Sequence, residues 1–190
     1  MDQRPAAWSE FYNQPRVMTI GLLSDTHGFL DERVFDHFAD CDQVWHAGDV
    51  GNADIFERLA AFKPLKAIYG NIDGNEVRRK WPGELRFACE GLQVWMTHIG
   101  GYPPRYKPDI LKVFKTYQPH IFVCGHRHIL RVMTDAKLNH LLYLNPGAAG
   151  HHGFHTVRTL LKFEINDARV ANVRVIELGR RGVMPAAAGR

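Results

Sequence analysis

The sequence predicts an α/β protein, and three observations lead to that prediction. Short apolar runs alternate with helical patterns between residues 17 and 70, which gives a βαβαβ opening. From residue 120 onward, strand patterns follow one another with little helix between them. Apolar residues make up 45% of the 190 positions, enough for one substantial core. We therefore expect one domain over residues 17–178, with flexible tails at 1–16 and 179–190.

The first half of the chain holds the alternating elements. Residues 17–25 (VMTIGLLSD) form an apolar, β-branched run that is typical of a buried strand. Residues 30–39 carry apolar side chains at helical spacing, and Asp31 is placed to cap that helix. Parallel strands joined through helices have right-handed crossovers. The unit is completed by a strand and turn over 42–50, a helix over 53–62 and a strand over 65–70.

The second half predicts a meander of strands. Residues 85–98 fit two strands joined by a turn at Glu90 and Gly91. The last two strands are joined in the same way by the short connection 166–168. The other expected elements are a helix over 108–118 and strands over 120–126, 130–134, 140–145, 156–165 and 170–178.

Composition narrows the class of protein. The formal net charge is +4, from 24 basic and 20 acidic residues, which suits an anionic substrate but does not by itself indicate nucleic-acid binding. No stretch approaches the ~20 apolar residues of a membrane span, and residues 1–16 lack the apolar core of a secretory signal. The basic runs 78–80 and 180–182 are expected on the solvated surface. Cys41, Cys89 and Cys124 fit reduced, buried thiols in a cytoplasmic protein.

Side chains that bind metals follow each strand that could end at one rim of the sheet. Ligands bind beyond the carboxyl ends of strands in open α/β sheets, so these positions could converge. Residues two apart in an extended segment can keep both side chains on one side. The positions are Asp25 with His27, His46 with Asp49, Asn71, His98, and His126 with His128.

The donor count favours two metal ions. Without His46, the set offers two carboxylates, one amide oxygen and four imidazoles, more than one ion needs. Mixed nitrogen and oxygen donors favour manganese, iron, zinc, cobalt or nickel over calcium. Two such ions about 3.5–4 Å apart can activate water and hold a phosphoryl group during displacement.

The ordered motifs DTH, GD, GN, a single strand-end His and GHRH resemble those of the calcineurin-like metallophosphoesterase superfamily. The size is most similar to its small prokaryotic YfcE-type phosphodiesterase branch, and the resemblance covers residues 18–178. The NPGAAG segment over 145–150 is similar to an NPGS-like turn of that branch. The resemblance implies a four-layer αββα sandwich of two mixed β-sheets flanked by helices.

The resemblance also implies roles for individual residues. Two divalent transition metal ions are expected, most naturally Mn²⁺, with Fe, Zn, Ni or Co as alternatives, and a metal-activated hydroxide would attack phosphorus. Asn71 and Arg127 are the expected substrate contacts, although Arg127 could equally point into solvent. One ion would be bound by Asp25, His27 and His128, the other by Asn71, His98 and His126, with Asp49 bridging; catalysis would rest on Asp25, His27, Asp49, Asn71 and His98.

Two positions depart from the family pattern. The family often has Gly-Asn-His where this chain has Gly70-Asn71-Ile72, and isoleucine has no proton to give to a leaving oxygen. The usual His-Gly-His is replaced by His98-Ile99-Gly100, so a second histidine is missing. We therefore expect a strong dependence of the rate on the leaving group.

The other polar residues are expected to support the site. His46 would orient a ligand or fill a strand end, and Asp73 would be a turn carboxylate. The histidines of the segment HHGFH (His151, His152 and His155) are expected in a polar loop near the rim, outside the ligand set.

Several functions remain open from the sequence. The leading one is hydrolysis of a small phosphodiester or nucleotide-like substrate, with a phosphomonoesterase or nucleotide pyrophosphohydrolase as alternatives. A non-catalytic scaffold similar to the metallophosphoesterase-like subunit of the retromer coat is a third. A single-stranded nuclease would use Tyr102, Arg105, Tyr106 and Lys107. Edge strands also make a homodimer an option.

Overall fold

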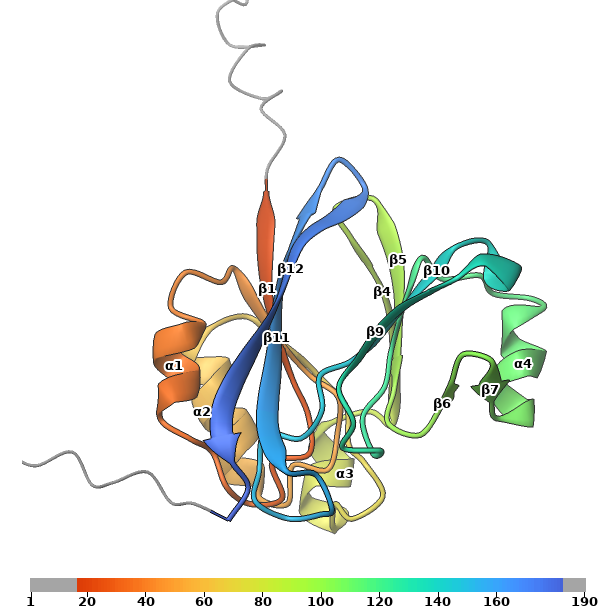
Figure 1. Ribbon diagram of the computed structural model, residues 1–190. Helices are drawn as coiled ribbons and strands as arrows, with labels where there is room; N and C mark the ends of the chain where they lie inside the picture. Colours follow the sequence, from red (N-terminus) through yellow and green to blue (C-terminus); the bar gives the residue numbers. More distant parts are fainter. Residues whose placement is uncertain (1–16, 183–190) are drawn as a thin grey trace, which may run out of the picture.

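The computed structural model describes residues 17–182, and two five-stranded sheets dominate it (Figure 1). Both are mixed: parallel pairs lie at β1–β2–β3 and β5–β8–β10, and antiparallel pairs flank them. The first sheet has the order β12 (Arg169–Arg180), β11 (Val157–Asn166), β1 (Met18–Leu23), β2 (Gln43–His46), β3 (Leu65–Ala67). The second has the order β4 (Glu84–Cys89), β5 (Leu92–Thr97), β8 (Ile121–Val123), β10 (Leu141–Asn145), β9 (Arg131–Asp135).

Helices cover the outer faces of both sheets, so the molecule has the four αββα layers that the resemblance implies. Helices α1 (Arg33–His37) and α2 (Ala53–Phe62) lie beside the first sheet, and α4 (Pro108–Phe114) lies beyond the second (Figure 1). The smaller elements are α3 (Asn75–Lys80), the 3₁₀ turn η2 (Ala136–Leu138), and the short strands β6 (Gly101–Tyr102) and β7 (Arg105–Tyr106).

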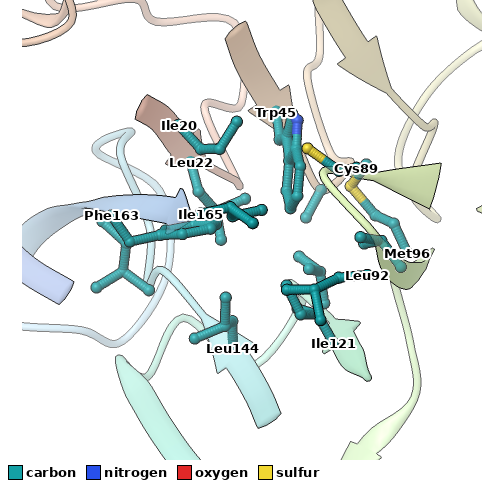
Figure 2. Packing of buried hydrophobic residues seen from close by; sticks show 14 of the residues in the cluster. Ile20, Leu22, Trp45, Cys89, Leu92, Met96, Ile121, Leu144, Phe163 and Ile165 are labelled. Atoms are coloured by element: carbon teal, nitrogen blue, oxygen red, sulfur yellow. The ribbon is translucent and has the colours of Figure 1, made fainter. Parts of the chain in front are cut away.

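The central core lies between the two sheets. Alternate side chains of each strand point inward, so Ile20 and Leu22 of β1 face Met96 and Ile121 of the second sheet (Figure 2). The indole of Trp45 meets the rings of two phenylalanines edge to face, Phe87 at 5.0 Å and Phe163 at 5.5 Å between centroids. These contacts fix one sheet against the other.

Two further cores hold the helices on the outer faces. Phe38 packs on β1 at Gly21, where an added Cβ would lie 2.6 Å from the ring, so a larger residue there would push α1 away. Phe56 and Leu59 of α2 join the same cluster. Beyond the second sheet, Phe114 of α4 stands edge to face with Trp95 at 5.5 Å.

Asp31 does not occupy the N-cap position as predicted, because Glu32 does, without a side-chain cap hydrogen bond. The helix begins at Arg33, and Asp31 accepts the Arg33 N–H at 3.1 Å. Its carboxylate also pairs with the guanidinium groups of Arg33 at 2.7 Å and of fully buried Arg158 at 2.8 Å. Burial works to raise the Asp31 pKa, but the hydrogen bonds from Arg33 and Arg158 lower it well below its usual range. The ion pair between Asp31 and Arg158 ties the start of α1 to β11.

Most predicted elements are present with shorter bounds. Both predicted hairpin turns have two left-handed residues, Glu90 with Gly91 and Asp167 with Ala168, and their tips touch at one end of the molecule (Figure 1). Strand β12 continues through Arg180, so residues 179 and 180 are not part of a tail. The proposed tail 1–16, and the part of the proposed tail 179–190 from residue 183 onward, lie outside the described residues. The three cysteines are buried and free.

No helix within residues 17–182 is long and apolar enough to cross a membrane. Three elements were not predicted, namely α3, η2 and the β6–β7 pair, because each spans only a few residues and leaves no readable periodicity.

Candidate metal centre

Loops from both sheets meet at the end of the molecule opposite the hairpin tips. The loops after β1, β2 and β3 come from the first sheet, and those after β5 and β8 from the second. The backbone N–H of His126, after β8, donates to both carboxylate oxygens of Asp25, after β1, at 3.1 and 3.2 Å. The rim of one sheet is therefore bonded directly to the rim of the other.

Six of the seven predicted ligands form two triads of potential metal donors. Within each triad, one ligand atom per residue lies within 4.8 Å of the others. The triads also face each other: Asp49 Oδ2 lies 3.8 Å from His27 Nε2, and Asp25 Oδ1 lies 3.9 Å from His98 Nε2. The first triad is Asp25, His27 and His128, and the second is Asp49, His98 and His126.

The protonation pattern of the histidines fits metal ligation. His98 Nδ1 lies 2.7 Å from the carbonyl oxygen of Ala47 and must donate to it, which leaves a lone pair on Nε2. That Nε2 is buried and makes no hydrogen bond, although Asp49 Oδ2 lies 3.1 Å away. Nε2 atoms of His27 and His128 stand 3.2 Å apart, and the two rings cannot both be donors there. Lone pairs gathered beside buried carboxylates suit a divalent cation.

Burial and charge set the ionisation of the triads. Burial lowers the pKa of His27 and of His126, so both imidazoles favour the neutral form that binds metals. Burial would raise the pKa of Asp49, but the neighbouring His98 lowers it overall. The site thus combines an ionised Asp49 with His27 and His126 imidazoles that favour the neutral form. Although burial opposes the shift, Asp49 and Asp25 raise the pKa of His98.

The backbone at the ligands is unusual. All five ligand residues in the loops after β1, β2 and β8 have positive φ, between 49° and 67°. Non-glycine residues seldom adopt this left-handed conformation, although Asn, Asp and His do so more readily than most. It reverses the chain at each ligand and aims the side chains at one point; the five are Asp25, His27, Asp49, His126 and His128.

Two glycines leave room for the ligands. A Cβ at Gly70 would lie 2.0 Å from Asp49 Oδ1, and a Cβ at Gly153 would lie 2.0 Å from His128 Nδ1. Any side chain at either position would collide with a donor. The close approach of these loops explains both glycines.

The Asn71 loop sits over the second triad. Asn71 is exposed and lines the same hollow of about 260 Å³ as His27 and Asp49, so it stands beside the triads, and its role as a ligand stays a prediction. The next residue, Ile72, donates its N–H to Asp49 Oδ1 at 3.1 Å and leaves its side chain 47% exposed. Asp73 is buried and accepts N–H bonds from Val50, Gly51 and Gly70, which confirms its role as a turn carboxylate.

His46 lies behind the triads. Its Nδ1 accepts the Gly48 N–H at 3.2 Å, so Nε2 carries the proton and donates to Thr26 Oγ1 at 3.1 Å. Complete burial lowers the pKa of His46 to about 4 and keeps the ring neutral. As predicted, it supports the turn between Asp25 and His27 and belongs to neither triad.

The HHGFH loop, residues 151–155, packs directly against the rings of two ligand histidines. The ring of His152 lies 4.8 Å from that of His27, and the ring of His155 lies 5.3 Å from that of His128. Phe154, at the tip, is fully exposed and lines the same hollow. These histidines stay outside both triads, as predicted, but they pack on the ligand rings.

Sequence reasoning missed one supporting residue. The run 78–80 was expected to be a solvated surface, yet Arg78 donates to the carbonyl oxygens of Gly70, Asn71 and Asp73 at 2.6–3.2 Å. Its guanidinium also lies 4.6 Å above the Tyr69 ring. Arg78 therefore holds the loop that carries Asn71, a role no local pattern could indicate.

Comparisons with known proteins agree with this geometry. Residues 18–168 match the family model of the calcineurin-like phosphoesterase superfamily domain. A probable metallophosphoesterase of Methanothermobacter thermautotrophicus is 30% identical over 138 residues, which are 69% of this chain and 77% of that protein.

Two solved structures share the fold. An archaeal phosphodiesterase has a TM-score of 0.67 at 20% identity, over 85% of this chain and all of that one. A Zn²⁺ complex of Vps29 from Entamoeba histolytica has a TM-score of 0.64 at 16% identity, over 87% of this chain and all of that one. From the family match and the relative, the chain belongs to the calcineurin-like phosphoesterase superfamily.

Proposed function

We propose that this protein hydrolyses phosphodiesters with the help of two divalent metal ions. The observation that carries the proposal is the pair of facing triads, with Asp49 of the second triad 3.8 Å from His27 of the first. Asp25, His27 and His128 would hold one ion; Asn71, His98 and His126 would hold the other, with Asp49 shared. Ions bound there supply Lewis acidity and an acidified water for attack on phosphorus. Mixed nitrogen and oxygen donors fit Mn²⁺, with Fe, Zn, Ni or Co as alternatives.

The surrounding residues position these groups. Ala47 O fixes the His98 ring so that Nε2 faces Asp49, and the Ile72 N–H holds Asp49 from the other side. Arg127 lies at the wall of the hollow, where it would meet a phosphate oxygen. The hollow of about 260 Å³ suits a phosphodiester group with part of one substituent.

The histidine that the family often has after Asn71 is missing, which favours substrates with acidic leaving groups, and we expect aryl diesters to be the best of them. The position after Asn71 is Ile72, so an acidic leaving group that needs no protonation would react best. The likeness to an archaeal phosphodiesterase is consistent with this choice but, at 20% identity, supports only the fold.

The scaffold alternative draws on the likeness to Vps29. At 16% identity that likeness also concerns the fold alone. A scaffold has no need for ligand atoms gathered within 4.8 Å or for an unbonded, buried His98 Nε2. Metal-dependent hydrolysis uses both features, whereas binding of a partner protein by itself requires neither.

The decisive experiment assays bis-p-nitrophenyl phosphate, p-nitrophenyl phosphate and glycerol phosphate with added Mn²⁺. We expect the aryl diester to be hydrolysed fastest and about two metal ions per chain by elemental analysis. Asp49→Ala should abolish metal retention and hydrolysis. Asp54→Ala, which removes an exposed carboxylate on α2, is the matched control and should change neither. A protein that binds no Mn²⁺, or that prefers glycerol phosphate, would refute the proposal.

A further inference from the structure

A second hollow adjoins the candidate metal centre. It measures about 400 Å³ and is formed by the β6–β7 pair and the loop after β8. His126 and Arg127 line both this hollow and the one of about 260 Å³ that contains the triads. A molecule bound at the triads could therefore extend into the second hollow past these two side chains.

The second hollow is basic. Arg105, Lys107 and Arg127 line it, and no Asp or Glu does. None of the three forms an ion pair within residues 17–182, unlike Arg33, Arg58, Arg86 and Arg158 elsewhere in the fold. Three unpaired cations that face one concave surface favour an anion with more than one negative charge. We call this surface the basic hollow.

The backbone that carries Arg105 and Lys107 is anchored, and Arg127 packs on an aromatic ring. Two guanidinium groups pack on the ring of Tyr102, with Arg131 4.0 Å and Arg127 5.4 Å from its centroid. The β6–β7 pair is anchored from below, because Tyr143 donates its hydroxyl to the carbonyl oxygen of Gly101 at 2.9 Å. Tyr106, expected as a stacking aromatic, is buried and donates to Asp135 at 3.0 Å, so it also serves as an anchor. Such a preformed site binds its ligand with little ordering cost.

We propose that the basic hollow binds a second phosphate group of the substrate while the scissile diester lies at the triads. The substrate would then be a phosphodiester of nucleotide size that carries an additional phosphate monoester. Arg105 and Lys107 would bind that group, and Arg127, which borders both hollows, would lie between the two phosphates. This inference rests on the proposed phosphodiesterase function and adds the substrate class to it.

The test compares two chromogenic diesters that differ by one phosphate. They are the p-nitrophenyl ester of thymidine 5′-phosphate and the same ester phosphorylated at the 3′ hydroxyl. We expect the 3′-phosphate to lower KM about tenfold or more in the wild-type protein, since each charge-assisted contact is worth roughly that factor. In the Arg105→Ala/Lys107→Ala double variant the ratio of the two KM values should fall to about one.

Removing two positive charges could weaken binding of the 3′-phosphate at long range, without any direct contact. A variant that lacks two positive charges elsewhere controls for this effect. Lys112→Ala/Lys115→Ala removes the same two charges from the exposed side of α4, outside the hollow, and should keep the KM ratio of the wild type. An equal loss in both double variants, or a wild-type ratio near one, would overturn the proposal.

A binding measurement separates this inference from the proposed function. By calorimetry, the wild-type protein should bind thymidine 3′,5′-bisphosphate about tenfold more tightly than thymidine 5′-phosphate, and the Arg105→Ala/Lys107→Ala variant should not distinguish them. If neither ester is hydrolysed but this preference holds, the function fails and the basic hollow stands. If both esters are hydrolysed and the preference is absent, the basic hollow fails alone.

Discussion

Ile72 is the single residue that most limits the chemistry of the site. It follows Asn71, its side chain is exposed over the hollow, and its backbone N–H already holds Asp49 at 3.1 Å. That backbone contact does not depend on the side chain. The side chain can therefore be changed with little effect on the triads. Substitutions at this position test whether the site lacks a proton donor for the leaving group.

We predict that Ile72→His speeds hydrolysis of alkyl diesters by about tenfold or more and that of aryl diesters much less. A proton donor helps most when the leaving oxygen is basic, and general acid catalysis is typically worth about 10²–10⁴ when fully aligned. The measurement is the slope of log kcat/KM against leaving-group pKa over a series of diesters. Ile72→Asn, which is polar but carries no acid, should keep the steep slope of the wild type. A shallow slope in the wild type would show that another residue supplies the proton.

Among the elements, the short helix α3 supports the loop that bears Asn71. It spans six residues, and Arg78 in its last turn bonds three carbonyl oxygens of the loop that bears Asn71. The neighbouring Arg79 is exposed and makes none of these contacts. The two arginines differ in what they touch, although both are basic and exposed.

We expect Arg78→Ala to weaken metal binding at the Asn71 side of the centre. Partners that orient metal ligands typically account for about 10–100-fold in affinity. The Mn²⁺ concentration for half-maximal activity should rise by about tenfold, and fewer ions should remain per chain after desalting. Arg79→Ala is the control and should match the wild type. Equal effects of the two substitutions would mean that the charge of α3, and not the contacts of Arg78, is responsible.

The same element shows what the sequence could and could not predict. Asp25, His27, His126 and the other ligands could be predicted because strand ends are local features, and parallel strands place their carboxyl ends at one rim. Arg78 could not, since its role depends on backbone carbonyls that only the folded loop presents to it. The sequence singles out each of Arg105, Lys107 and Arg127, but nothing in it indicates that they line one hollow. Its walls come from two segments that the second sheet brings together.

At the scale of the whole molecule, the triads bridge the two sheets. The first triad takes Asp25 and His27 from the first sheet and His128 from the second. The second triad likewise joins Asp49 to His98 and His126. This rim therefore joins the two sheets, in addition to the core in Figure 2 and the hairpin tips at the other end.

Metal removal should therefore destabilise the entire fold. An ion that binds only the folded chain adds about 2.7 kcal/mol when its concentration is 100 times its Kd. For a chain of this size, we expect Mn²⁺ to raise the Tm of EDTA-treated protein by about 5–10 °C, measured by calorimetry. Asp49→Ala should lose most of this rise, because its carboxylate faces ligands from both sheets, and Asp54→Ala should retain it. If Mn²⁺ left the wild-type Tm unchanged, the triads would not be a metal site that joins the sheets. A rise that persisted in Asp49→Ala would place the bound ion elsewhere.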